Sequence, residues 1–127
     1  MPLVRIDLRR GKSGEFKRTL TNEIYETMRE TFNVPENDRF MVINEHDEDN
    51  FAFDRSYLGI ERSDDLVLIQ ITANNTRSQE TKQAFYARLV ERLSERPGLR
   101  PQDIFINLLE VQKENWSFGN GIAQYVV

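Results

Sequence analysis

Residues 1–8 of the chain, Met-Pro-Leu-Val-Arg-Ile-Asp-Leu, decide how the rest of the sequence is interpreted. From Leu3 to Leu8 apolar and polar side chains alternate, which is typical of a strand buried on one face. Pro2 stands directly before this strand, and because proline is a small second residue we expect Met1 to be removed. The mature chain would then begin with a secondary amine at the head of a buried strand.

A free amine at Pro2 suits acid–base chemistry. An α-amino group titrates at about pH 7.7–8.0, and burial among apolar side chains disfavours its charged form and lowers its pKa. A group whose pKa lies near the working pH can both give and take a proton. A Met-Pro start also occurs at the head of ordinary strands, so this dipeptide does not by itself predict an enzyme.

The second half of the chain repeats the first. Residues 66–69, Leu-Val-Leu-Ile, resemble residues 3–6, Leu-Val-Arg-Ile, and each is followed by a loop, a helix and a further strand. Residues 35–40 and 100–105 also match, with a proline, an acidic residue and a phenylalanine in similar places. This self-similarity predicts a tandem βαβ repeat.

The expected fold class is therefore α+β or α/β, in a single domain over residues 1–127. The repeats span about residues 2–60 and 65–127, and each gives two parallel strands joined by a right-handed helical crossover. Together they form one four-stranded mixed sheet with two helices on one face. The other face, apolar in the second-half strands, needs a cover, and a symmetric oligomer is the usual one.

Apolar spacing and capping residues locate the two helices. The first is expected from Ser13, its N-cap, to about Thr31, and the second from a cap at Thr76 or Ser78 to about Ser94. Apolar residues recur along one face of each helix. They are Phe16, Leu20, Ile24, Met28 and Phe32 in the first helix, and Phe85, Tyr86, Leu89, Val90 and Leu93 in the second.

Further strands are expected over residues 39–44 and 104–109, with a short edge strand at residues 51–53. The continuous apolar run at residues 66–71 predicts a strand covered on both faces. Residues 73–78 are expected to form a loop.

Composition excludes several functions. The chain has 127 residues, a net charge of −4 and spread basic residues, unlike the basic patch of a nucleic-acid-binding protein. There is no cysteine, and the one histidine, His46, is interpreted as a solvated residue of an acidic loop, so no His-rich metal site is expected. No apolar run reaches the ~20 residues of a membrane span, and no signal peptide is expected, because the N-terminus lacks an apolar h-region. We therefore expect a soluble, cytoplasmic protein that binds neither nucleic acid nor membranes.

Several motifs give the chain a resemblance to a known superfamily. They are Met1-Pro2 opening a strand, Pro35-x-Asn37-Asp38-Arg39, Lys82 followed by Phe85-Tyr86, and Trp116-Ser117-Phe118-Gly119-x-Gly121. With the two βαβ units, they resemble the tautomerase superfamily, and within it the malonate semialdehyde decarboxylase branch, over the whole chain. The resemblance implies a tautomerase-like β-α-β fold, a homotrimer, no cofactor and no metal.

The resemblance also implies site residues: Pro2 as the catalytic group and Asp38 as its partner. In the decarboxylases an Arg-Pro-Arg segment before the second helix binds the substrate carboxylate. Here Asn75-Thr76-Arg77 matches it, so Arg77 is kept, whereas Asn75 replaces the first arginine and is expected to donate a hydrogen bond instead. A helix N-terminus beside Arg77 would add to its attraction for an anion.

Each assignment has a structural alternative. Asp38 can be a turn residue or can pair with Arg39, and Asp103 at the corresponding place of the second half favours such a role. Arg77 can be a solvated surface charge. The aromatic residues Trp116, Phe118 and Tyr125 can wall the pocket around the proline, pack in a trimer, or do both.

Three functions remain open from the sequence. The first is decarboxylation of a small 3-oxo acid, malonate semialdehyde being the model substrate, with a possible accompanying hydratase activity. The second is keto–enol tautomerisation of a pyruvate-type substrate, in which neutral Pro2 shuttles a proton. The third is a non-catalytic trimeric binding module. The substrate in either enzymatic case is a small carboxylate.

Overall fold

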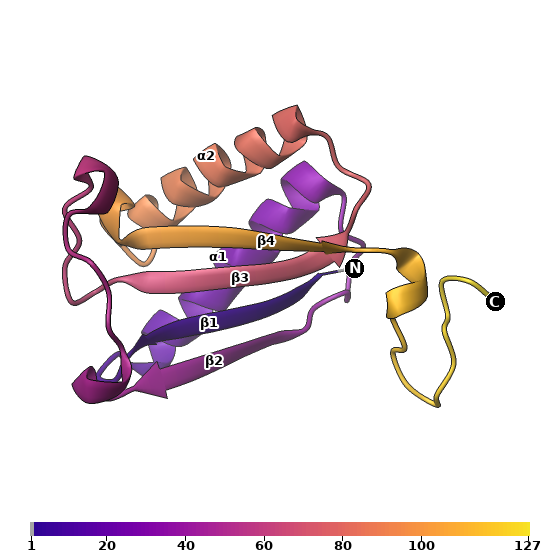
Figure 1. Cartoon of the computed structure of the whole chain (residues 1–127), viewed down its shortest axis with the longest axis horizontal. Helices are drawn as coiled ribbons and strands as arrows, with labels where there is room; N and C mark the ends of the chain where they lie inside the picture. Colours follow the sequence, from indigo (N-terminus) through magenta and orange to yellow (C-terminus); the bar gives the residue numbers. More distant parts are fainter. Residues whose placement is uncertain (1) are drawn as a thin grey trace.

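Four strands form one sheet in the computed structural model, which describes residues 2–127. Their order is β2-β1-β3-β4, with β1 at Leu3–Arg9, β2 at Met41–His46, β3 at Val67–Asn74 and β4 at Ile104–Val111. β1 is parallel to β2, β3 is parallel to β4, and the central pair β1 and β3 is antiparallel. The four-stranded mixed sheet is confirmed (Figure 1).

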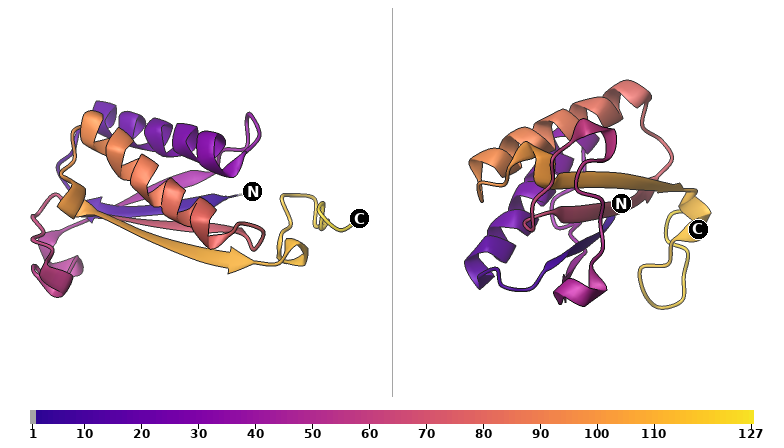
Figure 2. Two further views of the ribbon diagram at one scale, coloured as in Figure 1. Left: turned by 90° about the horizontal axis from the view of Figure 1, so that it is seen from above. Right: turned by 60° about the vertical axis from the view of Figure 1, so that its left-hand side comes forward.

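Both helices, α1 at Gly14–Phe32 and α2 at Gln79–Glu95, cover the same face of the sheet (Figure 2). Ser13 caps α1 as expected, its hydroxyl accepting a backbone N–H of the first turn at 3.0 Å. The cap of α2 is Ser78 rather than Thr76. Within the described residues, neither helix is long and apolar enough to cross a membrane.

The core lies between the helices and the sheet. The predicted stripe of α1 is confirmed, because Leu20, Ile24 and Met28 are fully buried against the strands. Phe32 at the end of this stripe stacks on Phe85 of α2, with ring centroids 4.4 Å apart. Burying a side chain of this size contributes about 1.5–3 kcal/mol.

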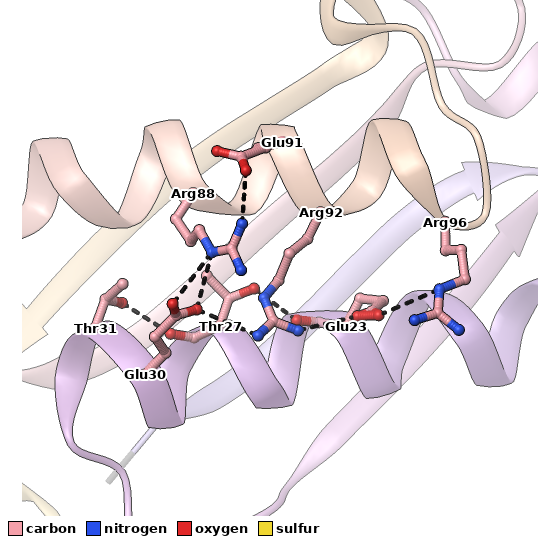
Figure 3. A network of polar contacts seen from close by, with 8 residues as sticks. All are labelled: Glu23, Thr27, Glu30, Thr31, Arg88, Glu91, Arg92 and Arg96. Carbon is pink, nitrogen blue, oxygen red and sulfur yellow. Dashed lines mark hydrogen bonds and ion pairs between the residues drawn. The ribbon is translucent and has the colours of Figure 1, made fainter.

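Ion pairs join the two helices along the side that faces away from the sheet (Figure 3). Arg88 of α2 contacts Glu30 of α1 at 2.9 Å. Arg92 contacts Glu30 at 3.2 Å and the buried Glu23 at 3.3 Å, and Arg96 lies 4.0 Å from Glu23. The arginines hold the pKa of Glu30 below its usual value.

One predicted strand is absent, and another is present with a different burial from the one predicted. Residues 51–53 form no strand; Phe51 is buried because its ring packs between those of His46 and Phe53. The strand predicted at 66–71 is not covered on both faces in the chain, since burial alternates along β3 and Gln70 is exposed. β3 also runs on to Asn74, which the sequence had suggested for a loop.

The open face of the sheet mixes apolar and polar side chains. Phe105 and Leu109 of β4 are exposed there, as expected for the second half. His46 is not a solvated loop residue: it ends β2, and its Nε2 lies 2.6 Å from Oδ1 of Asp7 on β1. Gln70 donates a hydrogen bond to the Asn107 side chain at 3.0 Å.

Candidate functional site

The sheet topology gathers four distant segments at one end of the sheet. β1 and β2 both begin there, and β3 and β4 both finish there, because β1 runs antiparallel to β3. Figure 1 shows this arrangement, with the C-terminal segment, residues 112–127, extending beyond the same end. Pro2, Asp38, Arg77 and Trp116 each lie next to one of these strand ends.

Pro2 is buried and lines a pocket of about 340 Å³. Trp116 and Phe118 line this pocket, their rings stacked with centroids 5.4 Å apart and planes inclined by 16°. Phe40, which is half exposed, stands at its rim. The surroundings of Pro2 are therefore largely apolar, which is the environment that disfavours a charged amine.

Asp38 lies in the turn before β2. The turn is closed by the Asp38 N–H, which donates to the carbonyl of Pro35 at 3.2 Å, and Asn37 adopts the left-handed conformation with φ of 70°. Burial raises the pKa of the Asp38 carboxyl, and the positive charge of Arg77 acts in the opposite direction. The neighbouring Arg39 guanidinium lies over the ring of Tyr25, 5.0 Å from its centroid.

Arg77 is held in place from the α1 side. Its Nη2 donates to the carbonyl oxygen of Phe32 at 3.0 Å, and its guanidinium lies 4.7 Å from the centroid of the Phe32 ring. Burial lowers the pKa of the Arg77 guanidinium, while Tyr125, Glu110 and Asp38 raise it. It is a partly buried, anchored cation rather than a freely solvated one.

Tyr125 connects this charged pair to the aromatic pocket. Burial and the Asp38 carboxylate raise the pKa of its hydroxyl, whereas Arg77 lowers it. The Tyr125 ring also meets Phe118 edge-on, with centroids 5.0 Å apart. The structure thus brings Tyr125, Asp38 and Arg77 together beside the pocket that contains Pro2.

Asn75 is the expected site residue that stands apart. It is exposed, and its backbone N–H donates to the Val111 carbonyl at 3.0 Å, which continues the pairing of β3 with β4. Within residues 2–127 the Asn75 side chain makes no hydrogen bond, and it does not line the pocket that contains Pro2. A hydrogen bond from Asn75 to the substrate stays a prediction.

Its neighbour Asn74 is a residue that sequence reasoning missed. Asn74 is only 8% exposed, and its Oδ1 accepts a hydrogen bond from the indole Nε1 of Trp116 at 2.8 Å. The one available signal was the alternation of β3, which continues through Thr72 and Ala73 and makes Asn74 the end of the strand.

Asp103, the counterpart of Asp38, has a different position and role. It precedes β4 and so lies at the opposite end of the sheet. It is fully buried and accepts from the backbone N–H of Ser63 at 2.8 Å and from its hydroxyl at 2.6 Å. This carboxylate fixes the connection between the two halves. No cluster of three or more His, Asp or Glu residues suited to a metal ion occurs within residues 2–127.

Comparisons with known proteins identify the family of the chain. Two family models, both described as tautomerase enzymes, match residues 2–59 and 38–119. The chain is 41% identical to the probable tautomerase YusQ of Bacillus subtilis (strain 168), over 99% of each chain. The chain belongs to the tautomerase superfamily.

Solved structures place the chain near one branch of that superfamily. A malonate semialdehyde decarboxylase, described together with its decarboxylase and hydratase activities, superposes with a TM-score of 0.91 at 31% identity, covering 97% of this chain and 95% of that one. FG41 malonate semialdehyde decarboxylase, inhibited by 3-bromopropiolate, gives 0.91 at 35% identity over 98% and 94%. A fused 4-OT that forms a symmetric trimer shares the fold alone, with 0.78 at 16% identity over 94% of each chain.

Proposed function

We propose that the protein is a cofactor-independent decarboxylase of a small 3-oxo acid, converting malonate semialdehyde to acetaldehyde and CO2 with the amine of Pro2. The observation that carries this proposal is the burial of Pro2 in an aromatic pocket beside a carboxylate and an anchored guanidinium. The likeness to two decarboxylases supports it. The chemistry requires removal of Met1, which lies outside the described residues, because a retained methionine would turn the amine into an amide.

Arg77 binds the substrate carboxylate in this proposal. The contact with the Phe32 carbonyl uses one N–H of the Arg77 guanidinium. The guanidinium carries five donors, so the remaining N–H groups can still form a bidentate pair with a carboxylate. Fixing the carboxylate allows the bond to be broken to align with the π-system of the aldehyde carbonyl. The aromatic pocket receives the remaining, apolar part of the substrate.

Pro2 stabilises the electron pair of the broken bond in one of two ways. As a protonated amine it donates a hydrogen bond to the aldehyde oxygen, so that the electron pair left by CO2 forms an enolate stabilised by the positive charge. As a neutral amine it attacks the aldehyde carbon, loses water to form an iminium, and receives the electron pair as an enamine. In either route a proton is added at C2, and acetaldehyde is released; in the second, water hydrolyses the iminium.

Asp38 orients the Pro2 amine or positions a water molecule. The positive charge of Arg77 favours a carboxylate at Asp38, against the burial that raises its pKa. With an unsaturated acid as substrate, the same carboxylate activates water for addition, which would give the accompanying hydratase activity.

Tautomerisation of a pyruvate-type substrate is the second candidate. The observation that favours it is the exposed Asn75 where the decarboxylase branch has an arginine, which leaves Arg77 as the remaining arginine of that segment. A proton shuttle by neutral Pro2 needs fewer binding partners than a decarboxylation. The similarity to YusQ, a probable tautomerase, is compatible with this reading.

We also propose that the protein is a homotrimer. Both edge strands are open within the chain, and Val42, Phe105 and Leu109 are exposed on the face that the helices leave uncovered. Light scattering after gel filtration is expected to give about 45 kDa for chains of 15.0 kDa; a monomer mass would contradict the trimer.

Proton NMR of malonate semialdehyde with the Met-cleaved protein tests the proposed reaction. Acetaldehyde is expected with the wild type and not with Pro2→Ala. If no acetaldehyde forms but the enol of an arylpyruvate is ketonised in a Pro2-dependent manner, the tautomerase candidate holds instead. If neither substrate reacts, the non-catalytic binding module becomes the better account. Borohydride reduction during turnover separates the two routes, since only the iminium leaves a covalent adduct on Pro2.

A further inference from the structure

We propose that Asn74 is a positioning residue for the Pro2 pocket: its side-chain oxygen holds the indole of Trp116 in place as a wall of that pocket. The inference rests on the proposed function, because it concerns the surroundings of the amine on which that reaction depends. It assigns a role to a residue that would not itself contact the substrate.

Asn74 has a fixed position from which it can hold the indole of Trp116. It is the last residue of β3, is 8% exposed, and is bounded by the hydrogen bond from the Asn75 N–H to the Val111 carbonyl at 3.0 Å. Its backbone therefore belongs to the paired part of the sheet. The Oδ1 atom accepts from Nε1 of Trp116 at 2.8 Å, a short and well-formed hydrogen bond.

The C-terminal segment, residues 112–127, is attached to the sheet through this hydrogen bond, which we call the anchor. It leaves the sheet after β4 and extends past its end (Figure 1). Its other side-chain hydrogen bonds are internal: Gln124 accepts from the Phe118 N–H at 2.9 Å and donates to the Gly119 carbonyl at 2.8 Å. Among the hydrogen bonds of residues 2–127, the one from Trp116 to Asn74 joins this segment to the sheet.

The anchor affects Pro2 through the aromatic stack. Trp116 and Phe118 are stacked and both line the pocket with Pro2, while Tyr125 packs against Phe118. If the indole detached from Asn74, the stack would lose its fixed end and water would reach the proline. Water stabilises the charged form of an amine, so the pocket would hold less of the neutral form.

The test uses Asn74→Leu, which keeps the size of the side chain and removes the acceptor, with Asn74→Asp, which retains an acceptor oxygen. Gln70→Leu is the matched control, because it removes another side-chain hydrogen bond of β3 and Gln70 does not line the pocket that contains Pro2. Trp116 is the single tryptophan of the chain, so intrinsic fluorescence reports on it alone.

In Asn74→Leu we expect a red-shifted emission and faster quenching by acrylamide, with the wild-type values in Asn74→Asp and Gln70→Leu. The kcat/KM of Asn74→Leu for the substrate that the wild type turns over should fall about five- to tenfold, as the loss of one hydrogen bond would give. The limb of its pH profile that reports the Pro2 amine should move to higher pH, whereas Gln70→Leu should keep the wild-type profile.

Wild-type emission and quenching in a folded Asn74→Leu would overturn the proposal, even if turnover were slower. If that variant does not fold, Trp116→Phe removes the donor instead, and an unchanged pH profile there would overturn it equally. If the wild type turns over no substrate, the proposed function fails, yet the fluorescence comparison still tests the anchor separately.

Discussion

The two aspartates at corresponding places of the two halves, Asp38 and Asp103, should respond in opposite ways to replacement. Asp103 is fully buried and accepts two hydrogen bonds from Ser63, at 2.8 and 2.6 Å, with Arg100 at 3.6 Å. Hydrogen bonds to charged groups contribute about 1.5–3 kcal/mol each, and their loss leaves the donors of the half-buried Ser63 unpaired. For Asp103→Ala we therefore expect the free energy of unfolding to fall by about 3–5 kcal/mol.

Asp38→Ala should leave the fold almost unchanged and remove the activity. Asp38 is half-buried in a turn, and burial raises the pKa of its carboxyl, so the charged form is already disfavoured at this position. We expect a change in unfolding free energy of no more than about 1 kcal/mol, as for an ordinary substitution. Turnover should fall by about 10²- to 10⁴-fold, the usual contribution of an acid–base group.

Urea unfolding followed by far-UV circular dichroism measures the first effect, and steady-state turnover measures the second. All variants must be compared at one protein concentration, because the stability of an oligomer depends on it. Asp103→Asn, which retains one acceptor oxygen, should lie between the wild type and Asp103→Ala. The reasoning is refuted if Asp103→Ala unfolds at the wild-type urea concentration, or if Asp38→Ala is as destabilising as Asp103→Ala.

Three further predictions concern the helix pair, the carboxylate and the guanidinium. Arg92→Met removes an ion-pair partner of the buried Glu23 and should lower the free energy of unfolding by about 2 kcal/mol. Adding Glu23→Gln should restore part of that free energy. A urea unfolding series in which the double variant is no more stable than Arg92→Met would contradict this prediction. As the pH falls, Asp38 becomes protonated and kcat/KM should decline, at a pH above the ordinary aspartate value of about 3.9 because burial raises its pKa; a pH–rate profile of Asp38→Asn should lack this limb. Arg77→Lys should raise KM about tenfold with a smaller effect on kcat, since an ammonium cannot both donate to the Phe32 carbonyl and form a bidentate pair; an unchanged KM would remove Arg77 from substrate binding.

Local sequence patterns predicted the fold correctly where both halves of the chain repeat them. The similarity of residues 3–6 to 66–69 identified the two central strands, and the regular spacing in α1 identified the face that Leu20 and Ile24 bury. The same kind of pattern misled at residues 51–53. Phe51 is apolar because it packs beside His46, and a side chain buried by a loop looks in sequence like one buried by a strand.

The candidate site was predictable to the extent that topology assembles it. Pro2 was expected from its place before the first strand, and Asp38 and Arg77 from the resemblance to the decarboxylases; a mixed sheet of two βαβ units brings the neighbouring strand ends together. The hydrogen bond between Asn74 and Trp116 was not predictable, because it joins residues 42 positions apart in the sequence and follows no periodic pattern. It depends on the path of a segment that leaves the sheet.

The central claim is that the free amine of Pro2 carries the reaction. The most direct measurement compares acetaldehyde formation from malonate semialdehyde by two forms of the same chain, one beginning at Pro2 and one retaining Met1, with each form verified by intact mass. Turnover is expected from the form with the free amine and none above background from the form in which Met1 converts that amine to an amide. Equal turnover by the two forms would contradict it.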